Sequence, residues 1–268
     1  MSAVTDQSWR SAVRLPRPHL SALQLWRRNF LVWRKLMGPS LLFNFGEPFV
    51  YLLGLGFGLG RFVGDVDGMP YLTFLASGLV AASAMNTASF EGMYSVFTRM
   101  VHQQTYDALL ATPLQVDDIV AGEMLWCATK SVLSGVPILA VAVLLGAVSE
   151  WSAILAIPLF FLVGLCFAGP ALVVSAFAPS YDFFSYYVTL LVTPMFIFSG
   201  VFYPVTTLPA FAQTIVEILP LSHAIALVRP LVAGLPVEAP MLHITVLLIY
   251  AIVGYIAATI FIRRRMIQ

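Results

Sequence analysis

Long apolar stretches separated by short polar breaks dominate the chain. A transmembrane helix requires about 20 consecutive, mostly apolar residues. The pattern predicts an all-α membrane protein with six spans, at residues 36–60, 71–98, 119–147, 153–178, 183–201 and 241–262. The polar breaks at 149–151 and 179–182 are very short. The third, fourth and fifth spans are therefore expected to be antiparallel neighbours.

The segment before the first span has a helical stripe of apolar residues at spacings of 3, 4, 3 and 4. The stripe consists of Leu23, Trp26, Phe30, Trp33 and Met37, and the other faces carry Arg27, Arg28, Arg34 and Lys35. A basic amphipathic helix with tryptophan on its apolar face is typical of the membrane interface. The alternative is a positively charged flank without a helix.

Composition and charge narrow the class of protein. Of the 268 residues, 60% are hydrophobic and 10% are charged, whereas soluble domains have about 25% charged residues. This composition excludes a soluble enzyme, a disordered chain and a collagen-like fibre. Seven of the 14 Lys and Arg residues lie in residues 1–35 and three lie at 263–265. No basic face exists between these ends, so a nucleic-acid-binding protein is excluded as well.

The same charges predict the orientation, because cytoplasmic loops are enriched in Lys and Arg. With six spans both termini share one side. Placing that side in the cytoplasm puts 11 of the 14 cations inside, leaves Arg61 and Arg229 outside and places Lys130 within a span. A cleaved signal peptide is not expected, because the first apolar run begins only after about 35 residues and is long.

Sequence signatures of catalysis are missing. The chain has no phosphate loop, no H-E-x-x-H and no G-x-S-x-G. Cys127 and Cys166 lie in apolar runs and are expected to be reduced thiols, and no metal-ligand spacing includes them. The glycines of 54–60 are spaced as in closely packed membrane helices rather than nucleotide loops. We therefore expect a subunit without catalytic activity.

Two segments between the predicted spans have unusual sequences for simple loops. Residues 99–114 are too polar to span, and Met100, Tyr106, Leu109 and Leu110 are compatible with a short helix that ends before Pro113. By the charge count this helix is cytoplasmic, and it either docks on another protein or is a simple connector. Residues 198–236 are apolar but interrupted by five prolines. They predict two short helices that dip back into the outer leaflet.

These features carry a resemblance to the permeases of ABC-2 type transporters. The motifs are Phe-Ser-Gly-Val-Phe-Tyr-Pro at 198–204, Pro-Leu-Ser-His-Ala at 220–224, Arg-Pro-Leu-Val-Ala-Gly at 229–234, Leu-Ala-Thr-Pro-Leu at 110–114 and Gly-Glu-Met-Leu-Trp at 122–126. Residues 100–107 and 121–130 are most similar to the nodulation-protein J group of these permeases. The resemblance covers roughly residues 20–268.

The resemblance implies an architecture and partners. Residues 1–35 would form a cytoplasmic segment with an amphipathic interface helix, and residues 36–268 the ABC-2 transmembrane domain. Re-entrant outer-leaflet helices would lie between spans five and six. Two permease copies would pair with two separate ATPase subunits in the inner membrane and export lipo-oligosaccharides. ATP and magnesium would bind to the ATPase, with no cofactor on this chain. The coupling helix would present Thr105, Tyr106, Asp107, Leu109 and Leu110.

Charged residues inside spans are candidates for the coupling route, because each costs about 2.5–3.5 kcal/mol on insertion scales. The candidates are Glu47, Glu91, Glu123 and Lys130. Glu123 and Lys130 are separated by about 10.5 Å of helical rise. Lys130 is therefore expected to pair with a glutamate on a neighbouring helix, such as Glu91. The alternative is structural pairing near the lipid headgroups.

Aromatic residues are the candidates for the substrate path. Phe49, Phe57, Tyr187 and Phe198 would line a path between two copies of the chain, and Phe202, Tyr203 and Pro204 would form an exit gate. Aromatic rings stack on sugars and contact acyl chains, which suits an amphipathic cargo. The alternative is lipid-facing bulk.

Two other functions remain open. One is the same machine exporting a drug or antibiotic. The other is an ATP-independent channel or secondary transporter, which predicts broken helices in matching halves of the chain. The sequence has one broken region, near its C-terminal end.

Overall fold

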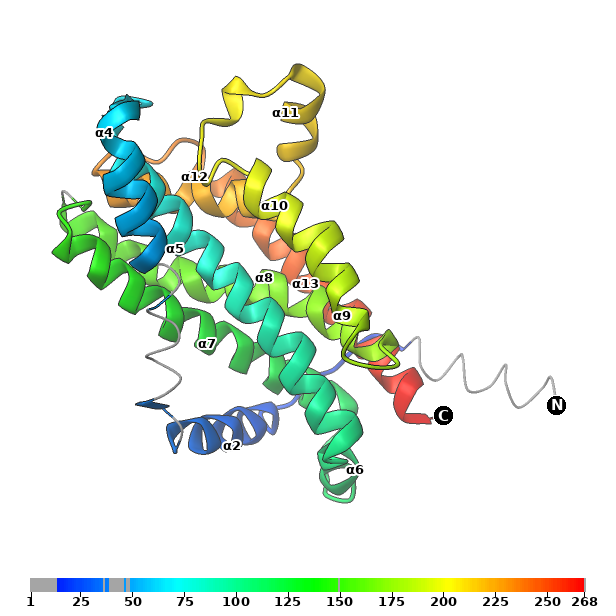
Figure 1. Ribbon diagram of the computed structural model, residues 1–268. Coiled ribbons are helices and arrows are strands. Elements are labelled where there is room, and N and C mark those ends of the chain that lie inside the picture. Colours follow the sequence, from blue (N-terminus) through cyan, green and yellow to red (C-terminus); the bar gives the residue numbers. More distant parts are fainter. Residues whose placement is uncertain (1–13, 36, 39–45, 47–48, 149, 268) are drawn as a thin grey trace.

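The computed structural model describes residues 14–35, 37, 38, 46, 49–148 and 150–267. Almost all elements are helices (Figure 1). In chain order they are α2 (Ala22–Arg34), η1 (Leu52–Leu59), α4 (Gly60–Val63), α5 (Tyr71–Phe90), η2 (Glu91–Ser95), η3 (Thr98–His102), α6 (Thr105–Leu110), α7 (Val116–Leu144), η4 (Trp151–Leu155), α8 (Ala156–Phe177), α9 (Phe183–Tyr187), η5 (Val188–Val192), α10 (Thr193–Phe198), η6 (Val205–Thr207), α11 (Ala210–Val216), α12 (Pro220–Ala233) and α13 (Pro240–Ile267). Strands β1 (Asp65–Val66) and β2 (Met69–Pro70) form a two-residue hairpin. The predicted all-α membrane architecture is confirmed.

Four helices in the described part of the chain are long and apolar enough to cross a membrane. They are Tyr71–His102, Val116–Leu144, Trp151–Phe177 and Pro240–Met266, and they correspond to the predicted spans two, three, four and six. The predicted spans one and five correspond to the shorter apolar helices Phe49–Val63 and Phe183–Phe198. Glu47 and most of the first half of predicted span one lie outside the described residues.

The proline-rich region after α10 folds into a sharply bent pair of helices. α11 and α12 meet at 84°. Proline fixes its own backbone and lacks an N–H, so it is favoured at the first turn of a helix. Pro209 precedes α11 and Pro220 opens α12. Gly234, with φ of 73°, ends α12 in a left-handed conformation that favours glycine.

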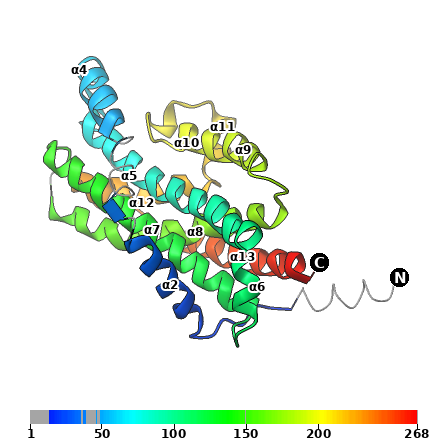
Figure 2. The ribbon, with the colours of Figure 1, turned by 60° about the horizontal axis from the view of Figure 1, so that its bottom comes forward.

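Helix α8 lies at the centre of the bundle and contacts α5, α7, α12 and α13 (Figures 1 and 2). Small residues allow the backbones to approach. A Cβ atom on Gly169 would lie 2.5 Å from Cα of Gly254 in α13, and one on Gly164 would lie 2.6 Å from Cα of Ala128 in α7. Close backbone approach at small residues is the usual packing mode of membrane helices.

The glycine run of residues 54–60 packs on one face only. A Cβ on Gly56 would lie 2.5 Å from a methyl carbon of Leu72, so this glycine meets α5. Gly54 and Gly58 have no atom within 4 Å of an added Cβ. The second smooth glycine face is therefore open in the described part of a single chain.

Helix α2 packs along the first half of α7. Its buried residues are Ala22, Leu25, Asn29 and Trp33. The predicted apolar stripe lies partly beside this face, since the Trp26 indole donates to Oγ1 of Thr129 at 2.8 Å and Phe30 packs edge-on against Trp126. Leu23 and Met37, at the ends of the stripe, are exposed.

The two ends of the described chain meet at the start of α7. Asp117 accepts a hydrogen bond from the backbone N–H of Arg17 at 2.7 Å and forms an ion pair with Arg263. Asp118 accepts one from the backbone N–H of His19 at 2.7 Å. The N-terminal segment and the end of α13 therefore lie on the same side of the bundle, as Figure 1 shows.

Candidate functional site

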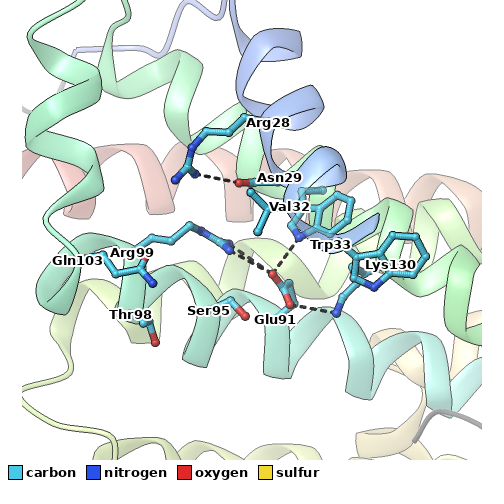
Figure 3. A pocket seen from close by; sticks show the side chains of 11 residues that line it. Arg28, Asn29, Val32, Trp33, Glu91, Ser95, Thr98, Arg99, Gln103 and Lys130 are labelled. Carbon is cyan, nitrogen blue, oxygen red and sulfur yellow. Dashed lines mark hydrogen bonds and ion pairs between the residues drawn. The ribbon is translucent and has the colours of Figure 1, made fainter. Parts of the chain in front are cut away.

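A buried cluster of charged and polar side chains connects α2, α6 and α7 with the C-terminal end of the long helix Tyr71–His102. We call it the carboxylate cluster, and it consists of Asn29, Glu91, Arg99, Tyr106, Glu123, Trp126 and Lys130. Figure 3 shows Glu91 between Arg99 and Lys130, with side chains of α2 along one side. The cluster combines two carboxylates with two cations, so its charges balance.

Glu123 is the central acceptor and is completely buried. Its Oε1 accepts from Nε of Arg99 at 2.9 Å and from the Tyr106 hydroxyl at 3.2 Å. Its Oε2 accepts from Nη2 of Arg99 at 2.7 Å and from Nδ2 of Asn29 at 3.0 Å. The bidentate arginine pair is the strong form of such a contact. One side chain of α7 thus binds partners on α2, η3 and α6.

Glu91 is the second acceptor. Its Oε1 accepts from the Trp126 indole at 2.8 Å and lies 3.4 Å from Nη1 and Nη2 of Arg99. Its Oε2 lies 3.4 Å from Nζ of Lys130. The structure thus gives Lys130 a glutamate partner on a neighbouring helix, as the spacing on α7 led us to expect. The side chain of Glu91 is 9% exposed, which places it inside the bundle.

Burial also determines the protonation state of Tyr106. Loss of water, together with the neighbouring Glu123 carboxylate, raises the pKa of Tyr106 well above its usual value. The phenol therefore keeps its proton and remains a donor. Tyr106 thus connects a short surface helix to a buried carboxylate without adding a charge of its own.

The cluster opens into a pocket of about 250 Å³ between α2 and the C-terminal end of the long helix Tyr71–His102. Arg28, Asn29, Val32 and Trp33 of α2 line one side of this pocket (Figure 3). Lys130 is 18% exposed and Arg99 is 14% exposed, so both cations reach its wall. A displacement of α2 would therefore change the access of solvent to the cluster.

Helix α6 coincides with the predicted coupling segment, but its residues face different ways. The sequence predicted that Tyr106 lies on the outer docking surface with the other four residues. In the structure Tyr106 is buried and faces the bundle instead. Thr105, Leu109 and Leu110 are half-buried, and both leucines pack against the core. Asp107 and Ala108 are exposed. Gln104, at φ of 48°, starts the helix from a left-handed conformation, which is uncommon outside glycine.

The aromatic residues predicted to line a path lie mainly on the surface of the single chain. Phe49, Phe57 and Phe198 are each 44% exposed, and Tyr187 is half-buried. Tyr51 packs against Phe196 and Phe202 with ring centroids 6.5 and 6.3 Å apart. The first apolar helix therefore contacts the start of the predicted exit gate. Tyr203 and Pro204 are half-buried in the segment that follows.

Arg229 is a further polar centre, at the other end of the bundle from the termini. Its guanidinium donates to the Gly200 carbonyl at 2.5 Å and to the Ser77 hydroxyl at 3.1 Å, and lies 3.6 Å above the ring of Phe74. Arg229 thereby joins α12 to α5 and to the bend after α10. Sequence reasoning counted it only as an outside cation.

Sequence reasoning also missed several members of the carboxylate cluster. Arg99 was counted only as a loop cation, and Asn29 and Trp126 were not considered. The one sequence signal for this cluster was Asn29, because it is a polar residue beside the apolar stripe of α2. Within the described residues, no three His, Cys, Asp or Glu side chains gather as metal ligands. The thiols of Cys127 and Cys166 are free and buried.

Comparison with known proteins agrees with this architecture. The profile of the family described as ABC-2 type transporter matches residues 21–233. Nodulation protein J of Rhizobium leguminosarum bv. viciae is 48% identical over 255 residues, which cover 95% of this chain and 98% of the relative. Nodulation protein J of Rhizobium meliloti (strain 1021) is 45% identical, covering 94% and 96% of the two chains. The inner membrane transport permease YadH of Escherichia coli (strain K12) is 24% identical, covering 74% and 76%. The chain belongs to the ABC-2 type transporter family and is a membrane subunit of an ABC transporter.

Proposed function

We propose that the chain is the permease subunit of an ATP-driven exporter in the inner membrane. In this proposal two copies work with two separate ATPase subunits, which bind ATP and magnesium, and this chain carries no cofactor. Helix α6 is the coupling helix. The observation that carries the proposal is the hydrogen bond from Tyr106 to Glu123, because it connects a short surface helix to the buried centre of α7.

The proposed topology has six spans with both termini in the cytoplasm. The four long helices are supplemented by Phe49–Val63, with residues that precede it, and by Phe183–Phe198. The contact between Asp117, Arg17 and Arg263 supports an even number of crossings, because it holds both ends of the described chain together. The basic ends then face the cytoplasm.

The proposed domain organisation follows from this topology. Residues 1–35 form the cytoplasmic N-terminal segment, and residues 36–268 form the transmembrane domain. Helix α2 acts as the interface helix, with Trp26 and Phe30 packed on α7 and the exposed Leu23 toward lipid. The 84° bend between α11 and α12 supports a re-entrant pair in the outer leaflet.

Movement in the proposed mechanism begins at α6. When the ATPase subunits close, they push on the exposed surface around Asp107 and Ala108. The Tyr106 hydroxyl transfers this displacement to Glu123. Arg99 and Asn29 bind the same carboxylate, so η3 and α2 move with it. Glu47, from the predicted first span, is a further candidate in this route.

The proposed dimer interface uses the apolar helix Phe49–Val63 and the helices α9 and α10. Gly54 and Gly58 present an open face where a second backbone can approach closely. Phe49, Phe57 and Phe198 are exposed beside it and, with Tyr187, line the proposed path between the copies. Phe202, Tyr203 and Pro204 form the proposed exit gate.

The proposed cargo is an amphipathic saccharide, such as a lipo-oligosaccharide. Support comes from the similarity to proteins named nodulation protein J and from the exposed aromatic rings, which suit sugar faces and acyl chains. Export of a drug or antibiotic is the alternative outcome. Uptake into inside-out vesicles that contain the ATPase, measured with each class of compound, distinguishes the two cargoes. ATP-dependent uptake of the antibiotic alone would overturn the saccharide assignment.

Purification with partners tests the coupling assignment. Gentle-detergent isolation from the native membrane is expected to yield a stoichiometric ATPase that contains a phosphate loop. Asp107→Arg on the exposed side of α6 is expected to release it. The matched control is Glu217→Arg, an exposed acidic residue at the far end of the bundle, which is expected to retain it. A stable, complete protein without an ATPase would overturn the proposal in favour of an ATP-independent transporter.

A further inference from the structure

Two histidines that are 20 residues apart in the sequence form a direct contact. Nδ1 of His223, in the first turns of α12, lies 2.7 Å from Nδ1 of His243, near the start of α13. Nε2 of His223 lies 2.9 Å from the carbonyl oxygen of Glu217, where α11 ends. The ring centroids are 5.0 Å apart. One pair of side chains thus joins α11, α12 and α13.

The geometry fixes where the hydrogens lie. A carbonyl oxygen only accepts, so Nε2 of His223 carries a hydrogen and donates it to Glu217. In neutral His223, Nδ1 is then an acceptor. The hydrogen between the rings belongs to Nδ1 of His243. A proton added to Nε2 of His243 leaves this chain of hydrogen bonds intact. A further proton has only Nδ1 of His223 to bind, which would set two N–H groups and two positive charges against each other at 2.7 Å.

We propose that His223 and His243 form a proton-sensitive latch, which holds the junction of α11 and α12 against α13 and opens when both histidines are protonated. The latch accepts one positive charge and breaks with two. A histidine takes up a proton near pH 6.5 when nothing perturbs it. The latch therefore opens as the pH falls.

The part released by the latch is the bent helix pair. A second tether, from the Tyr250 hydroxyl to the carbonyl of Ile218 at 2.9 Å, holds the same junction to α13. It does not titrate in the acidic range, so it acts as the hinge that remains. Phe211 and Ile215 of α11 are exposed. Release of the Glu217 carbonyl would let α11 rotate about Ile218 and move these apolar side chains.

The charged groups around the latch do not neutralise a second positive charge. The group that faces Nδ1 of His243 is Nδ1 of His223. On α11 the nearest acidic group is Glu217, which contacts His223 through its backbone and has an exposed side chain. Glu238, before α13, is exposed as well. On α12, Arg229 is bound to α5 and to Gly200 and adds positive charge. On α13, Tyr250 is neutral at these pH values.

Distance measurement between spin labels tests the latch. Thr214 on α11 and Thr245 on α13 are exposed and are replaced by cysteine for labelling, while Cys127 and Cys166 are buried and stay in place. The full chain in lipid nanodiscs is measured at pH 7.5 and pH 5, with both faces at the same pH. We expect one narrow distance at pH 7.5 and a shift of most molecules to a longer, broader distance at pH 5.

Asparagine variants supply the controls. His243→Asn keeps an amide that donates to His223 or, after a flip, accepts from it. At both pH values this variant is therefore expected to keep the narrow distance that the original protein shows at pH 7.5. His223→Asn is the second variant with the same expectation. His102→Asn, an exposed histidine at the opposite end of the bundle, is expected to retain the shift. An unchanged distance in the original protein, or a full shift in both latch variants, would overturn the latch. Neither result depends on the ATPase or the cargo, so the proposed function is tested separately.

Discussion

The hydroxyl of Tyr106 in α6 donates a hydrogen bond to Oε1 of Glu123 in α7 at 3.2 Å. Both side chains are buried, and the same carboxylate binds Arg99 and Asn29. A short helix at the surface is therefore connected to the inside of the bundle through one acceptor.

Glu123→Gln is expected to destabilise the protein strongly. The change leaves the buried Arg99 without its closest counter-charge, and breaking a buried ion pair costs about 3–5 kcal/mol. Thermal unfolding in nanodiscs measures the effect. The double variant Glu123→Gln with Arg99→Gln is expected to be more stable than Glu123→Gln alone, because no uncompensated charge remains. Equal unfolding temperatures for single and double variants would show that Arg99 does not depend on Glu123.

Lys130→Met and Glu91→Gln are expected to be coupled. The Nζ and Oε2 atoms are 3.4 Å apart, and residues in direct contact show interaction energies of about 0.5–3 kcal/mol in double-mutant cycles. Unfolding of both single variants and the double variant completes the cycle. Strictly additive effects would mean that this ion pair contributes nothing. Lys35→Met, an exposed lysine on the same side of the bundle, is the control and is expected to be additive with Glu91→Gln.

Two glycine substitutions are expected to act on different properties. Gly169→Ala places a Cβ 2.5 Å from the backbone of Gly254, and overpacking of this kind costs about 1–3 kcal/mol. The protein should therefore unfold at a lower temperature. Outside the backbone of its own helix, the added Cβ of Gly58→Ala meets no atom of the described residues within 4 Å. Gly58→Ala should leave the unfolding temperature unchanged and weaken the proposed dimer. The mass of the complex in nanodiscs measures the dimer. Lowered stability of Gly58→Ala would place this face inside the single chain.

Arg229→Gln is expected to loosen the segment after α10. The change removes the hydrogen bonds to Ser77 and Gly200 and the contact with Phe74, and the buried Gly200 carbonyl then loses its donor. Limited proteolysis should cut near residues 200–209 earlier than in the original protein. Arg229→Lys is expected to restore protection only in part, because one ammonium cannot reach all three partners. Identical digestion of all three proteins would contradict the role of Arg229.

The sequence was sufficient for the long helices and for the short helix α6, because apolar length and the proline that limits α6 are local signals. Spacing on one helix was also enough to reject a contact between Glu123 and Lys130 and to favour Glu91. The remaining members of the cluster were not predictable in this way. In the sequence Arg99 lies in a predicted loop, whereas in the structure the long helix Tyr71–His102 continues past it.

Contacts between distant segments were the least predictable part. His223 and His243 were scattered histidines in the sequence, and only the return of α13 past α12 brings them together. Burial of Tyr106 has a similar origin, since the periodicity of six residues does not show which side of α6 meets the bundle. Asp117, Arg17 and Arg263 are joined by packing that no local pattern records.

The ratio of transported cargo to hydrolysed ATP in Tyr106→Phe tests the central claim most directly. Phenylalanine keeps the buried ring and removes only the hydroxyl that donates to Glu123. A hydrogen bond to a charged group contributes about 1.5–3 kcal/mol. In proteoliposomes with the bound ATPase, we predict that Tyr106→Phe hydrolyses ATP but moves several-fold less cargo per ATP. An unchanged ratio, in a protein that still binds its ATPase, would contradict the claim that the Tyr106–Glu123 contact transmits the movement.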